Sequence, residues 1–188
     1  MYENKSLNEY LTELASNKPV PGGGSAAALV GAIGIACLTK VVSFTIGKEK
    51  YKSVEKEMKD FLNKLEILYG SFMKLCSEDA KAYKKLSDAF KMPKGEERDK
   101  KVQETLKEAM DVPLEICKNA YESISLCPAV REKGNKNLTS DVDCAIRMLK
   151  CAYQSAVVNV EINLKDVKDK EFVNRTRKTL KIMEGDMK

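Results

Sequence analysis

The stretch Pro19-Val20-Pro21-Gly22-Gly23-Gly24-Ser25 opens into an uncharged run, residues 26–39, and together they decide the fold. The prolines oppose a helix up to residue 21, and the glycines give the backbone the freedom to turn sharply into one. We expect Ser25 to cap that helix. Small residues recur along it at helical spacing, namely Ala28, Gly31, Ala32, Gly34 and Ala36. Because small side chains let other helices approach closely, the stretch predicts the buried central helix of an all-α domain.

The start of this helix is also a candidate ligand site. Its first N–H groups have no partner within the helix, and its glycines let a ligand come close to them. Gly22, Gly23, Gly24 and Ser25 are therefore candidate substrate-binding residues for an anionic or carbonyl-bearing group. The same glycines could serve tight packing alone, and this stretch by itself leaves both interpretations open.

Length and composition narrow the class of protein. The 188 residues suffice for a single domain, residues 1–188, with a buried core. The net charge of +5 is spread along the chain and no arginine clusters alternate with aromatic residues, so we expect no nucleic-acid partner. The six cysteines form no C-x-x-C pair and most fall on apolar helix faces, as buried reduced thiols do, and the N-terminus lacks a basic-then-apolar signal segment. Both features predict a cytoplasmic protein with reduced thiols.

One membrane alternative has to be considered, since residues 19–39 are uncharged over nearly the length that spans a bilayer. The segment opens with prolines and glycines, however, which leaves fewer apolar residues than a span needs. Alanine and glycine also supply little of the insertion energy that leucine, isoleucine and phenylalanine would. We therefore expect no membrane span and no membrane partner.

The remaining periodicity predicts a helical bundle without strands, internal repeats or a dividing linker. A capping box, Ser6 with Glu9, starts a short first helix. Pro113 is expected to begin a new segment or to bend an old one, and Pro128 lies near a further bend or end. The expected helices cover about residues 7–14, 25–47, 53–90, 96–110, 113–127, 140–164 and 170–184.

The absence of histidine restricts the possible chemistry. It excludes Ser-His-Asp and Cys-His catalysis, histidine-bearing zinc sites and the commonest general base near neutral pH. Any proton transfer must therefore use carboxylates, lysine, tyrosine, cysteine or the substrate itself.

Two carboxylates are candidate catalytic residues. Asp79 lies in register with the apolar stripe of the long helix 53–90, where a carboxylate must be paired, hydrogen-bonded or raised in pKa. Asp141 lies in the first turn of its helix, a position that is also common for purely structural carboxylates. Asp143 is better explained as part of a capping box with Ser140. Inward amides such as Asn159 and Asn163 either bridge helices or contact a ligand.

A polar loop, residues 134–141, precedes Asp141 and places two amides and a cation at a helix start. Asn135, Lys136 and Asn137 are the side chains concerned. Amide and ammonium groups beside free helix N–H groups form a suitable surface for recognising a polar ligand.

These motifs, taken together, resemble the cyclodeaminase/cyclohydrolase family, the C-terminal domain type of formiminotransferase-cyclodeaminase. They occur in order over residues 19–165, so the resemblance covers most of the chain. The motifs are Pro-x-Pro-Gly-Gly-Gly-Ser at 19–25, Ser43-Phe44-Thr45, Asp79 with Ala82-Tyr83, Val112-Pro113, Gly134-Asn135-Lys136-Asn137-Leu138-x-Ser140-Asp141 and Asn159-Val160-x-x-Asn163-Leu164-Lys165.

The resemblance implies an all-α fold, a homodimer or higher even oligomer, a tetrahydrofolate substrate, no metal and no permanently bound cofactor. It implies hydrolysis of 5,10-methenyl-tetrahydrofolate to 10-formyl-tetrahydrofolate, cyclisation of 5-formimino-tetrahydrofolate with loss of ammonia, or both. The positions that match the family motifs are Gly22, Gly23, Gly24, Ser25, Asp79, Asn135, Asn137 and Asp141.

We hypothesise that Asp141 activates water or takes the N10 proton, while Asp79 orients the pterin or acts as the partner acid. Lys50 and Lys136, with Lys48, could attract the glutamate tail of the folate, although surface lysines are more often simply solvated. A non-catalytic helical module that binds a ligand or a partner helix is the alternative that the residues alone leave open.

Overall fold

The uncharged run forms helix α2 (Gly23–Ser43), and Gly22 rather than Ser25 occupies its N-cap position. The prediction that Ser25 caps the helix is therefore wrong. Ser25 is fully buried, and its hydroxyl donates a hydrogen bond to the Cys76 carbonyl of helix α3 (Glu55–Lys91), 2.8 Å away. The hydroxyl thus joins two helices instead of satisfying the first N–H groups of its own.

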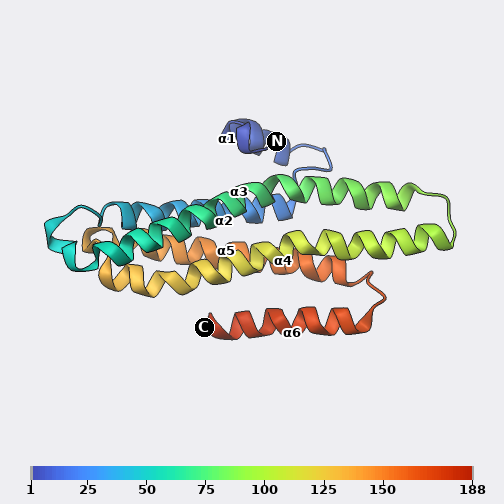
Figure 1. Cartoon of the computed structure of the whole chain (residues 1–188). Coiled ribbons are helices and arrows are strands. Elements are labelled where there is room, and N and C mark those ends of the chain that lie inside the picture. Colours follow the sequence, from blue (N-terminus) through green and yellow to red (C-terminus); the bar gives the residue numbers. More distant parts are fainter. Residues whose placement is uncertain (1, 188) are drawn as a thin grey trace.

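The computed structural model describes residues 2–187. Four helices lie side by side as an elongated bundle, with α1 packed on one side near the N-terminus and α6 on the other near the C-terminus (Figure 1). The 3₁₀ helix η1 (Tyr2–Asn4) comes first in the chain, η2 (Glu49–Val54) and η3 (Lys136–Leu138) connect helices of the bundle, and no strand occurs among the described residues. The α-helices are α1 (Leu7–Leu14), α2 (Gly23–Ser43), α3 (Glu55–Lys91), α4 (Glu96–Lys133), α5 (Thr139–Leu164) and α6 (Lys170–Asp186). The all-α prediction is confirmed.

Helix α2 packs closely against α3 and α5 because it has glycines at the contact points. A Cβ placed on Gly31 would lie 2.4 Å from the ring of Phe72 on α3. A Cβ on Gly34 would lie 3.0 Å from Leu149 on α5. Although α2 is long and apolar enough to span a membrane by length and composition, 56% of its most apolar window is buried inside the bundle. A buried core helix and a signal sequence both pass the same test of length and composition.

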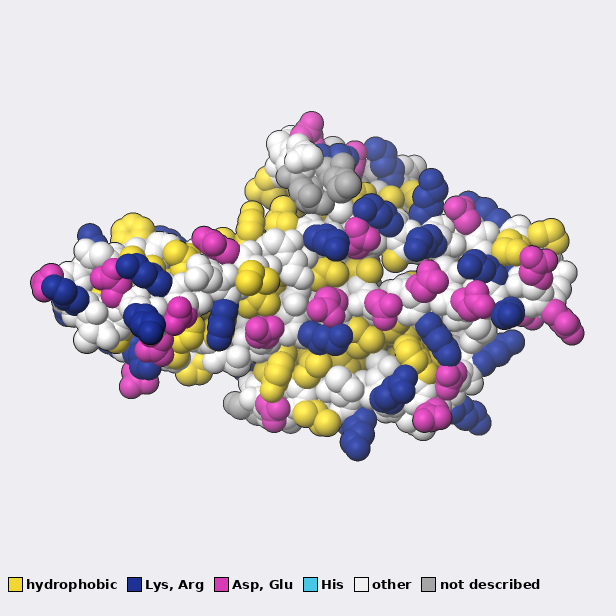
Figure 2. Space-filling view, viewed as in Figure 1, with side chains coloured by type: hydrophobic (Ala, Val, Ile, Leu, Met, Phe, Trp, Pro, Cys, Tyr) yellow, Lys and Arg dark blue, Asp and Glu magenta, His cyan; other side chains and the backbone are white. Residues whose placement is uncertain are grey.

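Helix α2 is not buried on every side, because one stripe of it is only partly buried and carries the exposed Ile33. Ile33 on this stripe is 42% exposed, and Val158 and Ile162 on the neighbouring stripe of α5 are 58% and 55% exposed. We call the combined surface the α2/α5 face. It comprises Ala26, Val30, Ile33 and Cys37 from α2, and Met148, Cys151, Ser155, Val158 and Ile162 from α5. The face shown in Figure 2 is different in character, since lysines, arginines and acidic residues are interspersed over it.

Helix α4 differs from the prediction because it runs unbroken through both of its prolines. A proline inside a helix removes one hydrogen bond and costs about 3 kcal/mol. The helix nevertheless continues, since it packs along its length against α3 and α5 and buries Pro113 between them. The predicted capping box at the start of α5 is also absent, because Leu138 rather than Ser140 occupies the N-cap position, and Asp143 pairs with Arg131 of α4. The Ser6–Glu9 capping box of α1 is confirmed.

The close contact at Gly31 gives a stability prediction. Gly31→Ala is expected to lower the free energy of unfolding by about 1–3 kcal/mol, because the new methyl group overlaps the Phe72 ring. Gly70→Ala is the matched control, since a Cβ on this glycine of α3 meets nothing within 4 Å and should stabilise the helix by about 0.5–1 kcal/mol. Urea unfolding followed by circular dichroism measures both changes. Equal effects of the two substitutions would contradict the packing described here.

Candidate active site

A pocket of about 230 Å³ lies at the N-terminal end of α2. The loop before α2 and the first turn of the helix form one wall, and side chains of α3, α4 and α5 form the others. The residues that give it polar character are Gly23, Gly24, Asp79, Tyr83, Asn159 and Asn163. A cavity of about 280 Å³ between α5 and α6 is larger, and two of its charged side chains, Arg177 and Glu161, pair with each other.

Asp79 is held against the first turn of α2. The backbone N–H of Ser25 donates a hydrogen bond to Asp79 Oδ2 at 3.0 Å. A Cβ on Gly24 would lie 2.1 Å from Asp79 Oδ1, so only glycine at position 24 leaves room for the carboxylate. The glycines were predicted to let a ligand approach the helix start, and in the structure they also let the Asp79 side chain approach it.

The environment of Asp79 favours its use in proton transfer. Burial raises the pKa of the Asp79 carboxyl above its ordinary value, and the hydrogen bond from the Ser25 N–H opposes this rise. A carboxyl group whose pKa moves toward neutrality can both accept and return a proton at working pH. In a chain without histidine, this is the kind of group that acid–base chemistry requires.

Two amides of α5 face the same pocket, as the sequence pattern indicated. Asn159 lies beside Gly23, where a Cβ would lie 3.6 Å from its side-chain nitrogen and oxygen. Its amide nitrogen donates to the Ser155 carbonyl one turn earlier, at 2.8 Å. Asn163, one turn later, also lines the pocket. The pocket therefore combines a carboxylate with side-chain amides that can recognise a polar heterocycle.

The other predicted site residues lie near the opposite end of α2. Lys40 forms an ion pair with Asp141 at 3.0 Å. Since Lys40 follows Ser25 by 15 residues of the same helix, the two ends are separated by about 22 Å along the helix axis. Asp79 and Asp141 therefore do not share a pocket within one chain.

The polar loop at this second end is largely engaged in structure. The Asn135 backbone N–H donates to Thr45 Oγ1 at 2.9 Å, and its side-chain nitrogen donates to the Phe44 carbonyl at 3.1 Å. The Lys136 ammonium donates to the last carbonyls of α4. The Asn137 side chain is exposed.

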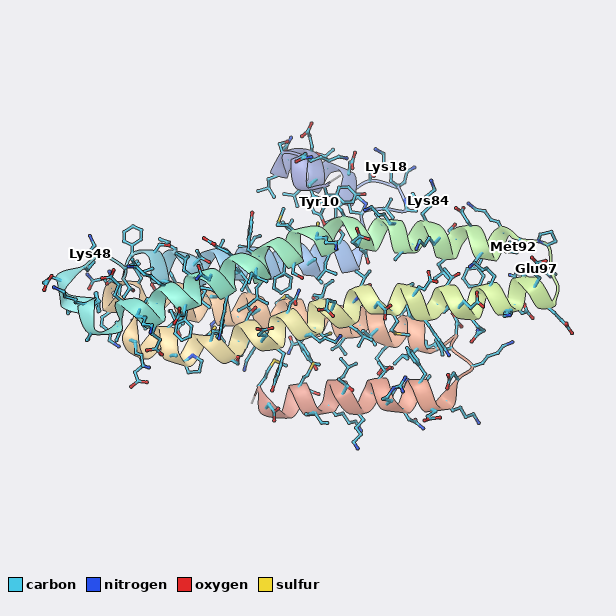
Figure 3. The ribbon with its side chains drawn as sticks, in the orientation of Figure 1. Tyr10, Lys18, Lys48, Lys84, Met92 and Glu97 are labelled. Atoms are coloured by element: carbon cyan, nitrogen blue, oxygen red, sulfur yellow. The ribbon has the colours of Figure 1, made fainter. Side chains whose placement is uncertain are left out.

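Lys50 and Lys48 belong to the same end as this loop. The Lys50 ammonium lies 5.5 Å from the ring centre of Tyr51, whose hydroxyl accepts a hydrogen bond from the Lys136 backbone. Figure 3 shows Lys48 at this end of the bundle, far from Met92 and Glu97 at the other. The structure thus brings the glycines, Ser25 and Asp79 together and leaves Asn135, Lys136, Asn137, Lys50 and Asp141 in a second group.

One residue near the pocket was not predicted from the sequence to be functional. Tyr10 of α1 contributes its hydroxyl to a bond with Ser25 Oγ, 3.0 Å away. Its place on the apolar stripe of the first helix predicts burial, but nothing in that pattern indicates where the hydroxyl is directed. Only the packing of α1 against α2 and α3 reveals it.

Comparison with known proteins gives one consistent family. The family described as Formiminotransferase-cyclodeaminase matches residues 6–182. A methenyltetrahydrofolate cyclohydrolase from Methylorubrum extorquens is 38% identical over 185 residues, covering 96% of this chain and 89% of that protein. A formimidoyltransferase-cyclodeaminase from Rattus norvegicus is 33% identical, and the chain spans only 33% of its length. The crystal structure of a formiminotetrahydrofolate cyclodeaminase from Thermotoga maritima superposes with a TM-score of 0.93 at 32% identity, covering 100% of this chain and 92% of that one.

The raised pKa of Asp79 predicts how stability depends on pH. The folded protein holds the Asp79 proton more tightly than the unfolded chain does, so ionisation of Asp79 destabilises the fold as pH rises through its folded-state pKa. Asp79→Asn cannot ionise, and its free energy of unfolding should exceed that of wild type near pH 7. Each unit of pKa difference contributes about 1.4 kcal/mol, and the advantage should vanish near pH 4.

Asp169→Asn is the matched control with the opposite sign. The Lys107 ammonium and the Phe172 N–H lower the pKa of Asp169, so its ionised form stabilises the fold and the substitution should destabilise it at neutral pH. Urea unfolding from pH 4 to pH 8 measures both differences. An Asp79→Asn variant that is less stable than wild type at pH 7 would contradict the burial of a proton-binding carboxyl there.

Proposed function

The chain belongs to the formiminotransferase-cyclodeaminase family, and we propose that it hydrolyses 5,10-methenyl-tetrahydrofolate to 10-formyl-tetrahydrofolate at the Asp79 pocket. It is a folate one-carbon enzyme of the cyclodeaminase/cyclohydrolase type. The hydrolytic reaction is supported by the 38% identity with the methenyltetrahydrofolate cyclohydrolase, which this chain covers over 89% of its length.

The observation that carries the proposal is the position of Asp79, a carboxyl of raised pKa that faces a pocket at a helix start. The methenyl carbon between N5 and N10 is a cationic, electrophilic centre. Its hydrolysis therefore needs an oriented water and one group that carries a proton. An ionised carboxylate beside the bridge would also stabilise its positive charge.

In the hydrolytic reaction, water adds to the bridge carbon and gives one proton to the Asp79 carboxylate. The resulting tetrahedral carbon carries a hydroxyl group between N5 and N10. The bond from this carbon to N5 then breaks as Asp79 returns the proton to N5. The hydroxyl proton leaves to solvent, the formyl group remains on N10, and one proton is released overall.

Cyclodeamination is the second candidate, and the likeness to the Thermotoga maritima cyclodeaminase favours it. Here N10 attacks the protonated formimino carbon on N5 and again forms a tetrahedral carbon. The proton on N10 passes through Asp79 to the amino group, which leaves as ammonia and yields the methenyl bridge. Since both reactions pass through the same kind of carbon, one pocket could serve either.

We also propose that two copies of the chain pair through the α2/α5 face. This face is apolar and exposed, and it extends between the Asp79 pocket and the Asp141 loop. A two-fold axis across α2 would place the two α2 helices antiparallel, so that the start of one meets the end of the other. Asp141 of the partner subunit would then approach the Asp79 pocket, where its carboxylate would orient the attacking water while Asp79 takes the proton.

The same pairing would bring the partner's Lys50, Asn135, Lys136 and Asn137 near the ligand. Their predicted roles in substrate binding therefore depend on the dimer.

We further propose that the protein is cytoplasmic and that it works with no metal and no permanently bound cofactor. No disulfide joins any of the six cysteines, all of which lie within the described residues, and this supports a reducing compartment.

The activity is tested by following loss of the methenyl chromophore against the spontaneous rate. Asp79→Asn should lower kcat by about 100-fold or more, because the proton carrier is lost. Asp169→Asn, which removes an acidic side chain that precedes α6 and does not line the pocket, is the control and should keep wild-type turnover. If wild type leaves the chromophore unchanged, ammonia release from 5-formimino-tetrahydrofolate tests the second candidate. Inactivity with both substrates would contradict the proposal.

The dimer is tested by light scattering during size-exclusion chromatography. Wild type should have twice the chain mass, and Val158→Asp, which buries a charge in the interface, should be a monomer that retains its helical signal. Ile67→Asp is the control because Ile67 is 72% exposed on α3, outside the α2/α5 face. A wild-type monomer with full turnover would contradict both the pairing and the role of Asp141.

A further inference from the structure

A chain of buried hydrogen bonds connects the N-terminal helix α1 with the Asp79 pocket. The structure describes every residue of α1, and Tyr10 is the only one of them that is buried, with 4% of its surface exposed. Leu7 and Leu11 of the same helix are 62% and 49% exposed. Tyr10 lies between α1 and α3 in Figure 3. Tyr10 is therefore the buried side chain that attaches α1 to the bundle, with the partly buried Leu14 also packed against the core.

The hydroxyl of Tyr10 has a defined role in this chain. Ser25 Oγ donates its only proton to the Cys76 carbonyl at 2.8 Å. Tyr10 must therefore be the donor in its 3.0 Å bond with Ser25 Oγ. The Cys76 thiol lies 3.1 Å from the same oxygen and must donate for the same reason. Ser25 Oγ thus makes one donated and two accepted bonds, which occupy all the directions open to a hydroxyl oxygen.

These bonds fix the residue whose backbone contacts Asp79. The Ser25 side chain is held from three sides, and its backbone N–H is the donor to Asp79 Oδ2 at 3.0 Å. A ring without a hydroxyl would fill the same space at Tyr10 but would leave one acceptor site of Ser25 Oγ without its donor. The hydroxyl of Tyr10, rather than the bulk of its ring, is therefore the group that influences the position of Ser25 at the pocket.

We propose that Tyr10 is a positioning residue of the active site, which acts through Ser25 to hold the Ser25 N–H on the Asp79 carboxylate. The inference rests on the proposed function, since it assigns to α1 a part in setting the proton affinity of Asp79. Without the Tyr10 hydroxyl, Ser25 is held less firmly, its N–H bond to Asp79 loosens, and the carboxylate loses the interaction that favours its ionised form.

Few other ionisable groups face Asp79. The pocket walls from α2, α4 and α5 contribute none among the described residues, and α3 contributes Tyr83. Burial raises the pKa of Tyr10, which keeps its hydroxyl protonated as a donor throughout the working range. Tyr2 of η1 and Cys76 of α3 complete the group of neighbours whose charges can reach Asp79 or Tyr10. Loss of the Tyr10 hydroxyl is therefore expected to act on Asp79 through Ser25.

The test compares Tyr10→Phe with Tyr153→Phe. Tyr153 of α5 is also 4% exposed, and its hydroxyl donates to the Leu180 carbonyl of α6 at 2.7 Å, away from the pocket. Each variant loses one buried hydroxyl, so both should lose similar stability in urea. The carboxyl titration of Asp79 is followed by ¹³C NMR on aspartate-labelled protein, with the signal assigned by its absence in Asp79→Asn.

Tyr10→Phe should move the Asp79 titration to higher pH and lower kcat on the order of tenfold, as expected for the loss of one hydrogen bond, with a smaller change in KM. The limb of the kcat–pH profile that reports Asp79 should move in the same direction. Tyr153→Phe should leave the titration and the profile unchanged. An unchanged Asp79 titration in Tyr10→Phe, or an equal shift in both variants, would overturn the proposal. Because the titration needs no substrate, a protein inactive on both folates would contradict the proposed function without affecting this result.

Discussion

The first turn of α2 packs very close to α3, and the rest of the structure depends on this constraint. The Asp79 carboxylate occupies the space that a side chain at Gly24 would fill, and it accepts the Ser25 N–H at 3.0 Å. Further along α2, Gly31 gives the ring of Phe72 the same kind of access. The glycines therefore determine both the packing of the bundle and the position of the Asp79 carboxyl, so tight packing is compatible with the proposed binding of a ligand at this stretch.

Two opposing effects act on that carboxyl. Burial among apolar residues raises its pKa, while the Ser25 N–H favours the ionised form. The balance suits a reaction in which one group takes a proton from water or from N10 and gives it back to nitrogen. The one-carbon bridge is already electrophilic, so the protein needs neither histidine nor a strong nucleophile of its own. Proton affinity and orientation are what its residues must supply.

The sequence predicted the fold well, since periodicity and caps are local properties. The capping box at Ser6 and the helix 170–184 were found with their approximate bounds. The unbroken α4 was missed because packing against two neighbours outweighs the local preference of Pro113. Of the candidate site residues, Asp79 and the glycines lie together, but the motif that ends at Asp141 lies near the far end of α2. Order along the chain does not indicate which helix ends face each other, and the direction of the Tyr10 hydroxyl depends on tertiary packing alone.

The most direct test of the account is a crystal structure of Asp79→Asn with 5,10-methenyl-tetrahydrofolate bound. We predict that the folate lies at the start of α2, with its bridge carbon and a water both near residue 79 and within the reach of one proton transfer, about 3 Å between heavy atoms. The side-chain amides of Asn159 and Asn163 should contact the same ligand. A folate bound in the groove between α5 and α6, or one that leaves residue 79 without contact, would contradict the central claim.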